Sequence, residues 1–303
     1  MGALRSRSHG QTNSVVNLFQ MKTILSATAL ALIGTISAQA ADMAVKAPPL
    51  PAEAGWTGGY LGLNGGYGWG RADVQAVPGD PNSQNVFHGQ PNIPPLAASI
   101  DTRGWLGGVQ AGYDWQIDQR WLVGFETDFD GASIKNGVSI PTTIGFGLQP
   151  ATFGASQTID WFGTARVRAG FLPTPDLLLY ATGGLAYGRV NQSETLALPA
   201  GQSNSSGNFG FAYACGPFYG PSANCFAGGA SRVSTGWSAG VGGEQRITRN
   251  WSVRLEYLHV DLGRGNATMT GNLPPRVPFT PSFLNTSSSA TFDLVRAGVN
   301  YRF

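Results

Sequence analysis

Apolar side chains alternate with polar or small ones along the last stretch of the sequence, Leu294–Phe303. This period of two predicts a β-strand with one apolar face and one polar face. The stretch stops on an apolar aromatic, Phe303, and a soluble protein gains little from an exposed Phe at that position. The apolar face must therefore meet something other than water.

Seven earlier stretches show the same alternation, which brings the predicted number of strands to eight. They are residues 58–70, 104–117, 121–130, 159–171, 177–187, 233–247 and 251–260. Short turns at 118–120, 172–176 and 248–250 follow the even-numbered strands, whereas links on the order of 25–40 residues, rich in Pro, Gly, Asn and Ser, follow the odd-numbered ones. A soluble sandwich rarely sorts its loops in this way. The sequence thus predicts an all-β fold, an eight-stranded antiparallel up-and-down transmembrane β-barrel with short periplasmic turns and long extracellular loops. Its closing strand would carry an assembly signal at Val299, Tyr301 and Phe303.

The tryptophans lie at the ends of these strands. Beside the long links are Trp69, Trp105, Trp161 and Trp237, and beside the short turns are Trp56, Trp115, Trp121 and Trp251. Two aromatic girdles at the two membrane interfaces explain this sorting. Aromatic residues packed in a soluble core would not be sorted by strand end.

The polar face of the strands collects charges of both signs. The predicted interior network is Asp114, Glu126, Asp128, Asp160, Arg166, Arg168, Glu244, Arg254, Glu256 and Arg296, with Asp130, Arg246 and Arg302 beside it. An eight-stranded barrel is only wide enough inside for its own side chains, and buried charges must be paired. We therefore expect salt bridges that fill the lumen; a narrow ion path is the alternative.

Composition agrees with a barrel and excludes some other classes. Charged residues make up only 12% of the chain, which has 43 glycines and 11% aromatic residues. Glycine costs a helix about 1 kcal/mol per residue, so this composition argues against a compact helical enzyme. The chain has 19 basic and 17 acidic residues. Three of the basic residues, Arg5, Arg7 and Lys22, belong to the leader, so 16 basic residues remain against 17 acidic ones. This balance does not favour nucleic acid as a partner.

The N-terminal region reads as a leader. Lys22 precedes an apolar run at 24–36, and Ala38-Gln39-Ala40 forms a small-residue cleavage site. These features predict a signal peptide at 21–40, because the run is too short to span a bilayer as a helix. Residues 1–20 fit no part of this signal, which favours an upstream mis-start and a natural start at Met21. Residues 41–55 are rich in proline and predict a periplasmic linker, followed by the barrel over 56–303.

Export implies an oxidising compartment. The two cysteines, Cys215 and Cys225, both lie in the exported part and predict one local disulfide. A metal or redox pair would need a nearby His or a CxxC spacing, and neither is present.

Four motifs together carry a resemblance to a known family. They are the closing Val299-x-Tyr301-x-Phe303 and the stretches 121–128, 161–171 and 179–188. With them the chain resembles the small outer-membrane immunogenic proteins of Gram-negative bacteria, OmpA-like β-barrels of the RopB type. The resemblance covers nearly all of residues 21–303. It implies a surface-exposed barrel inserted by the barrel-assembly machinery, with heme binding or pore activity proposed for some members. The loop at 190–232 is larger than the family leads us to expect.

Sites for catalysis are weak. Gly236-Trp-Ser-Ala-Gly240 matches a nucleophile elbow, but Ser238 lies in a continuous strand without the required following helix. Asp128-x-Asp130-Gly lacks the other ligands of a calcium loop. His259 near the outer rim has an acid at Asp261 but no neighbouring Ser, so a lipid-modifying site is incomplete. We expect no enzyme activity, no metal and no cofactor.

The sequence thus favours a structural outer-membrane barrel and surface antigen, with its lumen filled by salt bridges. The alternatives are a small porin or ligand (heme) binding barrel and, less favoured, an outer-membrane lipid-modifying enzyme. Expected partners are outer-membrane lipid, lipopolysaccharide and the barrel-assembly machinery. A surface ligand is left open, either at the aromatic cluster around the cysteine pair or at His88.

Overall fold

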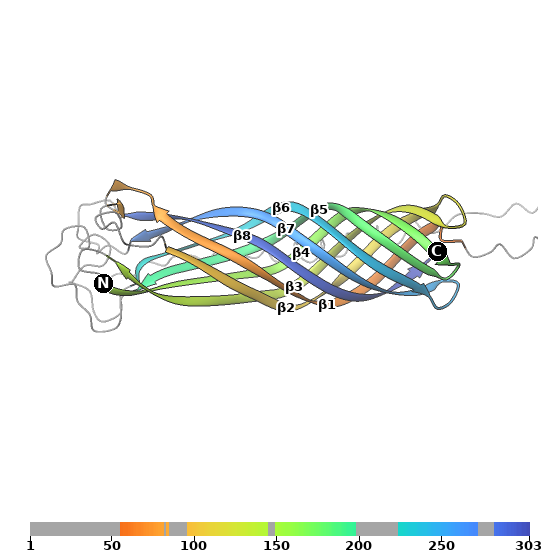
Figure 1. Ribbon diagram of the computed structural model, residues 1–303, viewed down its shortest axis with the longest axis horizontal. Coiled ribbons are helices and arrows are strands. Elements are labelled where there is room, and N and C mark those ends of the chain that lie inside the picture. The colour runs from red at the N-terminus through yellow and green to blue at the C-terminus, as the bar shows by residue number, and fades with distance from the viewer. Residues whose placement is uncertain (1–54, 82, 85–95, 145–148, 198–223, 272–281) are drawn as a thin grey trace, which may run out of the picture. The chain divides into compact units, whose positions relative to one another are not determined.

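The computed structural model describes residues 55–81, 83–84, 96–144, 149–197, 224–271 and 282–303. These residues form eight antiparallel strands in a closed barrel, in chain order (Figure 1). The strands are β1 (Gly58–Pro78), β2 (Leu96–Gln116), β3 (Trp121–Ile144), β4 (Gln149–Thr174), β5 (Leu177–Ala197), β6 (Asn224–Arg246), β7 (Trp251–Gly271) and β8 (Phe283–Arg302). The predicted fold class is therefore confirmed. Within the described ranges no helix is both long and apolar enough to cross a membrane.

The first and last strands close the ring. Tyr301 of β8 lies opposite Leu61 of β1, Val299 lies opposite Leu63, and the Phe303 amide donates to the carbonyl of Gly59 at 3.1 Å. This pairing leaves no free sheet edge. Backbone groups at a free edge would have no hydrogen-bond partners in lipid.

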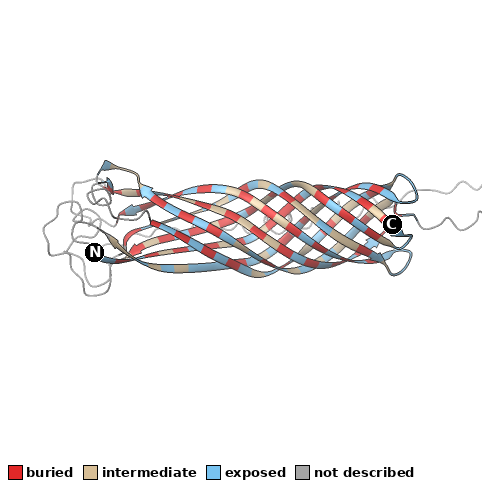
Figure 2. Cartoon of the chain, viewed as in Figure 1, coloured by how far each residue is buried: buried red, intermediate tan, exposed pale blue. Residues whose placement is uncertain are grey.

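Burial alternates along each strand, as the bands of Figure 2 show. The lipid-facing positions of the strands carry large exposed apolar side chains, such as Leu63 at 66% and Val167 at 70% of full exposure. The intervening positions are buried in the lumen. The alternation of apolar and polar residues in the sequence therefore matches the alternation of exposed and buried side chains along the strands.

The strands are longer than predicted. The prediction ended each strand near the point where the chemistry of its two faces inverts. On β1 the exposed face changes from Tyr67 and Trp69 to Arg71 and Asp73, while the buried face becomes apolar at Ala72 and beyond. An apolar outside suits lipid, and a polar outside around an apolar core suits water. The barrel thus continues beyond the outer girdle as a water-exposed segment, and much of the predicted long links belongs to strands. The three predicted short turns lie between the strands as expected.

The lumen is packed in layers. An apolar cluster at the periplasmic end contains Trp56, Leu122 and Leu178. A second apolar cluster surrounds Phe162 and Phe292, whose rings meet edge to face at 5.2 Å. A third one, built around Phe153 and joined by Leu96, Phe226 and Met269, fills the water-exposed segment.

Two placements differ from the sequence prediction. Asp160 was expected inside, but a β-bulge between Ile159 and Trp161 shifts the register, so Ile159 is buried and Asp160 is exposed. One extra residue reverses the faces that follow it. Trp56 was expected in the girdle beside the short turns, but it is only 1% exposed inside the periplasmic mouth.

Candidate functional site: a buried charge network in the lumen

The lumen between the first two apolar clusters is occupied by ionisable side chains. They come from six strands, and on each strand they occupy the alternate positions whose side chains point into the lumen. The buried set is Asp114, Glu126, Asp128, Asp130, Glu244 and Glu256 with Arg166, Arg168, Arg254, Arg296 and Arg302. With the exception of Asp160, the predicted network residues all lie in this set.

Arg166 of β4 is the centre of one tier. Its guanidinium contacts Glu126 at 2.6 Å, Asp128 at 2.9 Å and Glu256 of β7 at 3.0 Å, and it also donates to the Thr182 hydroxyl at 2.9 Å. All three ion pairs have no solvent exposure on either side chain. The planar fork of arginine suits such multiple carboxylate contacts.

Arg296 of β8 completes this tier from the opposite wall. Its guanidinium contacts Asp128 at 2.7 Å, Asp130 at 2.8 Å and Glu256 at 2.7 Å. Arg254 of β7 pairs with Glu126, which also accepts the Tyr60 hydroxyl at 2.6 Å. β8 and β7 are thereby tied to β3, which is not their neighbour in the ring.

A second tier lies nearer the periplasmic mouth. Arg168 contacts Glu244 at 2.6 Å and lies 3.8 Å from the centre of the Tyr180 ring. Glu244 also accepts hydrogen bonds from Ser252 at 2.5 Å and Asn300 at 3.0 Å. Arg302 contacts Asp114 at 2.7 Å, so β8 and β2 are joined here as well.

Trp56 closes the periplasmic mouth above the turns. The centre of its ring lies 4.5 Å from Cζ of Arg246 and 4.6 Å from Cζ of Arg302. The indole nitrogen donates to the Pro175 carbonyl at 2.9 Å. Cation–π stacking and this hydrogen bond hold a large side chain across the opening. Sequence reasoning missed this role, although Trp56 stands apart from the strand that begins at Gly58.

The network and its apolar neighbours can hold the lumen shut. Each ion pair is desolvated, so losing one partner costs about 3–5 kcal/mol. Side chains from opposite walls of the barrel meet directly in this network. The predicted network also did not include Tyr60, although Tyr60 lies on the inward face of its strand.

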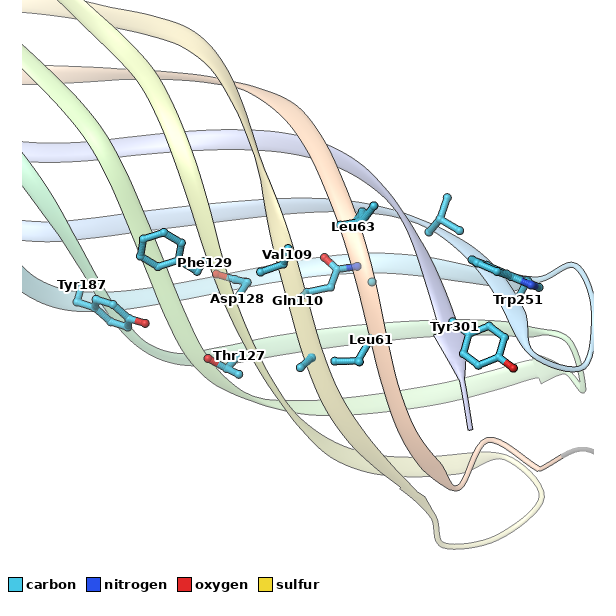
Figure 3. Close-up of a pocket in the computed structure, with 13 residues that line it drawn as sticks. Leu61, Leu63, Val109, Gln110, Thr127, Asp128, Phe129, Tyr187, Trp251 and Tyr301 are labelled. Atoms are coloured by element: carbon cyan, nitrogen blue, oxygen red, sulfur yellow. The ribbon is translucent and has the colours of Figure 1, made fainter. Parts of the chain in front are cut away.

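The outer wall carries seven of the tryptophans that were predicted to form the two girdles. The outer girdle consists of Trp69, Trp105, Trp161 and Trp237 with Tyr187, and the inner girdle consists of Trp115, Trp121 and Trp251. Between the girdles, apolar side chains of neighbouring strands, among them Leu61, Leu63, Val109 and Phe129, line one pocket (Figure 3). Val299, Tyr301 and Phe303 point to the same outer side, at 44%, 38% and 74% exposure.

Comparison with known proteins agrees with this architecture. The family model described as "Outer membrane protein beta-barrel domain" matches residues 28–303. The chain belongs to this family. It is located in the outer membrane, as the family and its relatives are.

Relatives in this family include immunogenic proteins. The chain is 34% identical over 289 residues to the 31 kDa outer-membrane immunogenic protein of Brucella melitensis, covering 93% of this chain and all of the relative. It is 24% identical over 298 residues to the 25 kDa outer-membrane immunogenic protein of Brucella canis, covering 93% and 99%. The resemblance stated from the sequence motifs is therefore confirmed.

Solved structures of similar proteins include two bacterial surface barrels. OprG of Pseudomonas aeruginosa is 11% identical, with 82% of this chain and 98% of OprG covered and a TM-score of 0.38. Neisserial surface protein A is 13% identical, with the same coverages and a TM-score of 0.34.

The other candidate residues do not assemble into a reactive site in the described part of the chain. Nδ1 of His259 lies 2.7 Å from the carboxylate of Asp293, not from Asp261. Ser238 is buried in the lumen on the continuous strand β6. No group of three or more His, Cys, Asp or Glu among the described residues could hold a metal ion. Cys225 is disulfide-bonded. Phe226, one member of the aromatic cluster around the cysteine pair, is buried in the third apolar cluster and not exposed. Cys215, His88 and the other members of that cluster, at 209–219, lie outside the described residues.

Proposed function

We propose that this protein is a non-conducting structural barrel of the outer membrane, which presents its water-exposed segment and loops as a surface antigen. The observation that carries the proposal is the closed charge network, in which Arg166 and Arg296 reach carboxylates of the facing wall with no solvent exposure. The apolar cluster around Phe162 and Phe292 supports it as a second barrier. The immunogenic relatives support the surface role.

Conductance of the refolded full chain in planar bilayers tests the closed lumen. We expect no steady channel, whereas a porin added to the same bilayer should conduct. A heat-dependent shift in gel migration would verify that the inserted protein is folded. A large, steady and reproducible conductance would mean that the lumen is a pore, which is the alternative function.

The proposal includes contact with outer-membrane lipid and lipopolysaccharide through the outer wall, and insertion by the barrel-assembly machinery through β8. It includes no catalytic step. The wall between the girdles is apolar, as lipid requires, and β8 ends on outward aromatic residues. Protease treatment of intact cells tests the surface role: we expect cleavage in the long links and protection of the strands between the girdles. Cleavage only after the outer membrane is opened would reject surface exposure.

A further inference from the structure

On three strands, β1, β2 and β5, a basic residue follows the outer aromatic residue at a fixed distance. On β1 Arg71 lies two residues beyond Trp69, and on β2 Arg103 lies two residues beyond Trp105. On β5 the same relation holds between Arg189 and Tyr187. In a strand, residues two apart lie on the same face. These cations therefore stand on the outer wall immediately outside the lipid-facing belt.

The inner girdle has no matching arrangement. The residue two positions beyond Trp115 is Ile117, and the one two positions beyond Trp121 is Gln119. Only Arg249, beyond Trp251, repeats the pattern there. Exposed Arg120 and Arg249 lie in the turns at the inner end, so the two ends differ in the spacing of cations from the girdle and not in their presence.

Arg103 and Lys135 are neighbouring basic residues. They are directly opposite each other on β2 and β3, and Trp69 of β1 is opposite Arg103 on the other side. Both side chains are exposed, and neither forms an ion pair with a carboxylate of the described residues. Like charges directly opposite each other on adjacent strands are destabilising. An anion bound between them would reverse the sign of this interaction.

The carboxylates nearby are engaged elsewhere. Asp101, one step further out, lies 3.7 Å from Arg71. Asp73 accepts a hydrogen bond from the Ser99 hydroxyl at 2.6 Å. On the wall formed by β1, β2 and β3, Arg103 and Lys135 thus have no ion pair with a described carboxylate at the level of the lipid headgroups.

We propose that Arg103 and Lys135 bind a phosphate group of the phosphorylated glycolipid in the outer leaflet, with Arg71 at the edge of the site. Guanidinium and ammonium groups donate to phosphate oxygens in charge-assisted hydrogen bonds. Trp69 and Trp105 lie below the phosphate, where their rings contact the boundary between headgroup and acyl chains. The inference rests on the proposed function in one respect, namely that the end with the long links faces the cell exterior.

Binding of lipid A to the refolded full chain tests the site. The probes are bisphosphorylated lipid A, the same lipid after enzymatic dephosphorylation, and phosphatidylglycerol, each measured by native mass spectrometry in detergent. The test variant is Arg103→Gln/Lys135→Gln. The control variant, Arg120→Gln/Arg249→Gln, makes the same charge change at exposed positions of the periplasmic turns.

We expect the test variant to bind bisphosphorylated lipid A roughly 30-fold more weakly than the wild type, because each basic residue near an anionic surface contributes about 1 kcal/mol. The control variant should bind as the wild type does, and dephosphorylated lipid should not distinguish the proteins. Equal binding by the test variant, or an equal loss in the control, would overturn the site. Equal affinity of the wild type for phosphatidylglycerol would overturn the assignment to glycolipid. These outcomes are independent of conductance, so a pore would reject the closed lumen and leave this site untouched.

Discussion

Nη2 of Arg296 on β8 lies 2.7 Å from Oδ2 of Asp128 on β3, across the lumen from one wall of the barrel to another. β8 pairs with β1 and β7, so this contact is not a consequence of sheet hydrogen bonding. Both side chains are fully buried. The contact joins two strands that are not neighbours in the ring through a buried pair of opposite charges.

Arg296→Met tests how much the charge network contributes to stability. Removing the guanidinium leaves Asp128, Asp130 and Glu256 with fewer partners in a closed interior. We expect a loss of about 3–5 kcal/mol in the free energy of unfolding, measured by urea titration of the refolded protein in detergent. Arg120→Met, on an exposed turn, should change stability by less than about 0.5 kcal/mol. Equal effects of the two substitutions would argue against a packed charge core.

Trp56→Ala should loosen the periplasmic mouth. The substitution removes a ring that forms cation–π contacts with Arg246 and Arg302, and it leaves the Pro175 carbonyl without its donor. We expect a loss of about 3–5 kcal/mol for this large-to-small change, whereas Trp56→Phe should cost only about 1–2 kcal/mol. Urea titration of both variants measures the difference. If alanine proved as harmless as phenylalanine, the indole would not be closing the opening.

Glu194→Gln should remove a pH dependence. Glu194 lies on β5 beyond Tyr187, above the lipid-facing belt, and burial raises the pKa of its carboxyl to about 7 despite the nearby Arg232. Because the folded pKa exceeds the ordinary value of 4.5, the stability linked to this proton is complete below pH 4.5 and is lost as the pH rises through 7. Relative to the wild type, the variant should gain about 1–3 kcal/mol between pH 5 and pH 8.

Unfolding titrations at the two pH values measure this gain. Asp101→Asn, at a carboxylate on the exposed wall, is the matched control and should show no comparable gain. A difference between wild type and Glu194→Gln that stayed constant with pH would show that the buried carboxyl does not titrate in this range.

Removal of the last aromatic side chain tests the predicted assembly signal. Phe303 is 74% exposed on the outer wall, so Phe303→Ala loses few internal contacts. We expect the variant to refold into detergent as the wild type does but to reach the outer membrane of cells several-fold less, as quantified by the folded band in membrane fractions. Val233→Ala, an exposed apolar position on β6, serves as control. Normal assembly of Phe303→Ala would remove this residue from the signal.

The lipid-facing half of the barrel could be predicted from the sequence because lipid outside and charge inside give the alternation a strong contrast. Leu63 and Asp128 illustrate the two faces, exposed and buried as their parity predicts. Beyond the outer girdle, the same parity carries Ala72 and Val74 inside and Arg71 and Asp73 outside. Water then replaces lipid as the outer solvent, so the chemistry of each face inverts and the stretch resembles a polar loop.

Two further misses have local causes. Asp160 changed sides because of a single bulged position, and period-two counting has no signal for an inserted residue. Trp56 was placed with the girdle because tryptophan is typical of membrane interfaces. Its burial depends on Arg246 and Arg302, which are far from it in sequence and meet it only when the barrel closes.

The central claim is that the outer wall of β1 leaves lipid for water at Trp69. Spin labels attached at Leu63→Cys and, separately, at Asp73→Cys in reconstituted protein test it most directly, since Cys225, the cysteine among the described residues, is disulfide-bonded. Collision rates with oxygen and with a water-soluble nickel chelate should show oxygen dominant at position 63 and the chelate dominant at position 73. If the chelate reached position 63 as readily as position 73, the lipid-facing wall and the membrane boundary placed at Trp69 would both be contradicted.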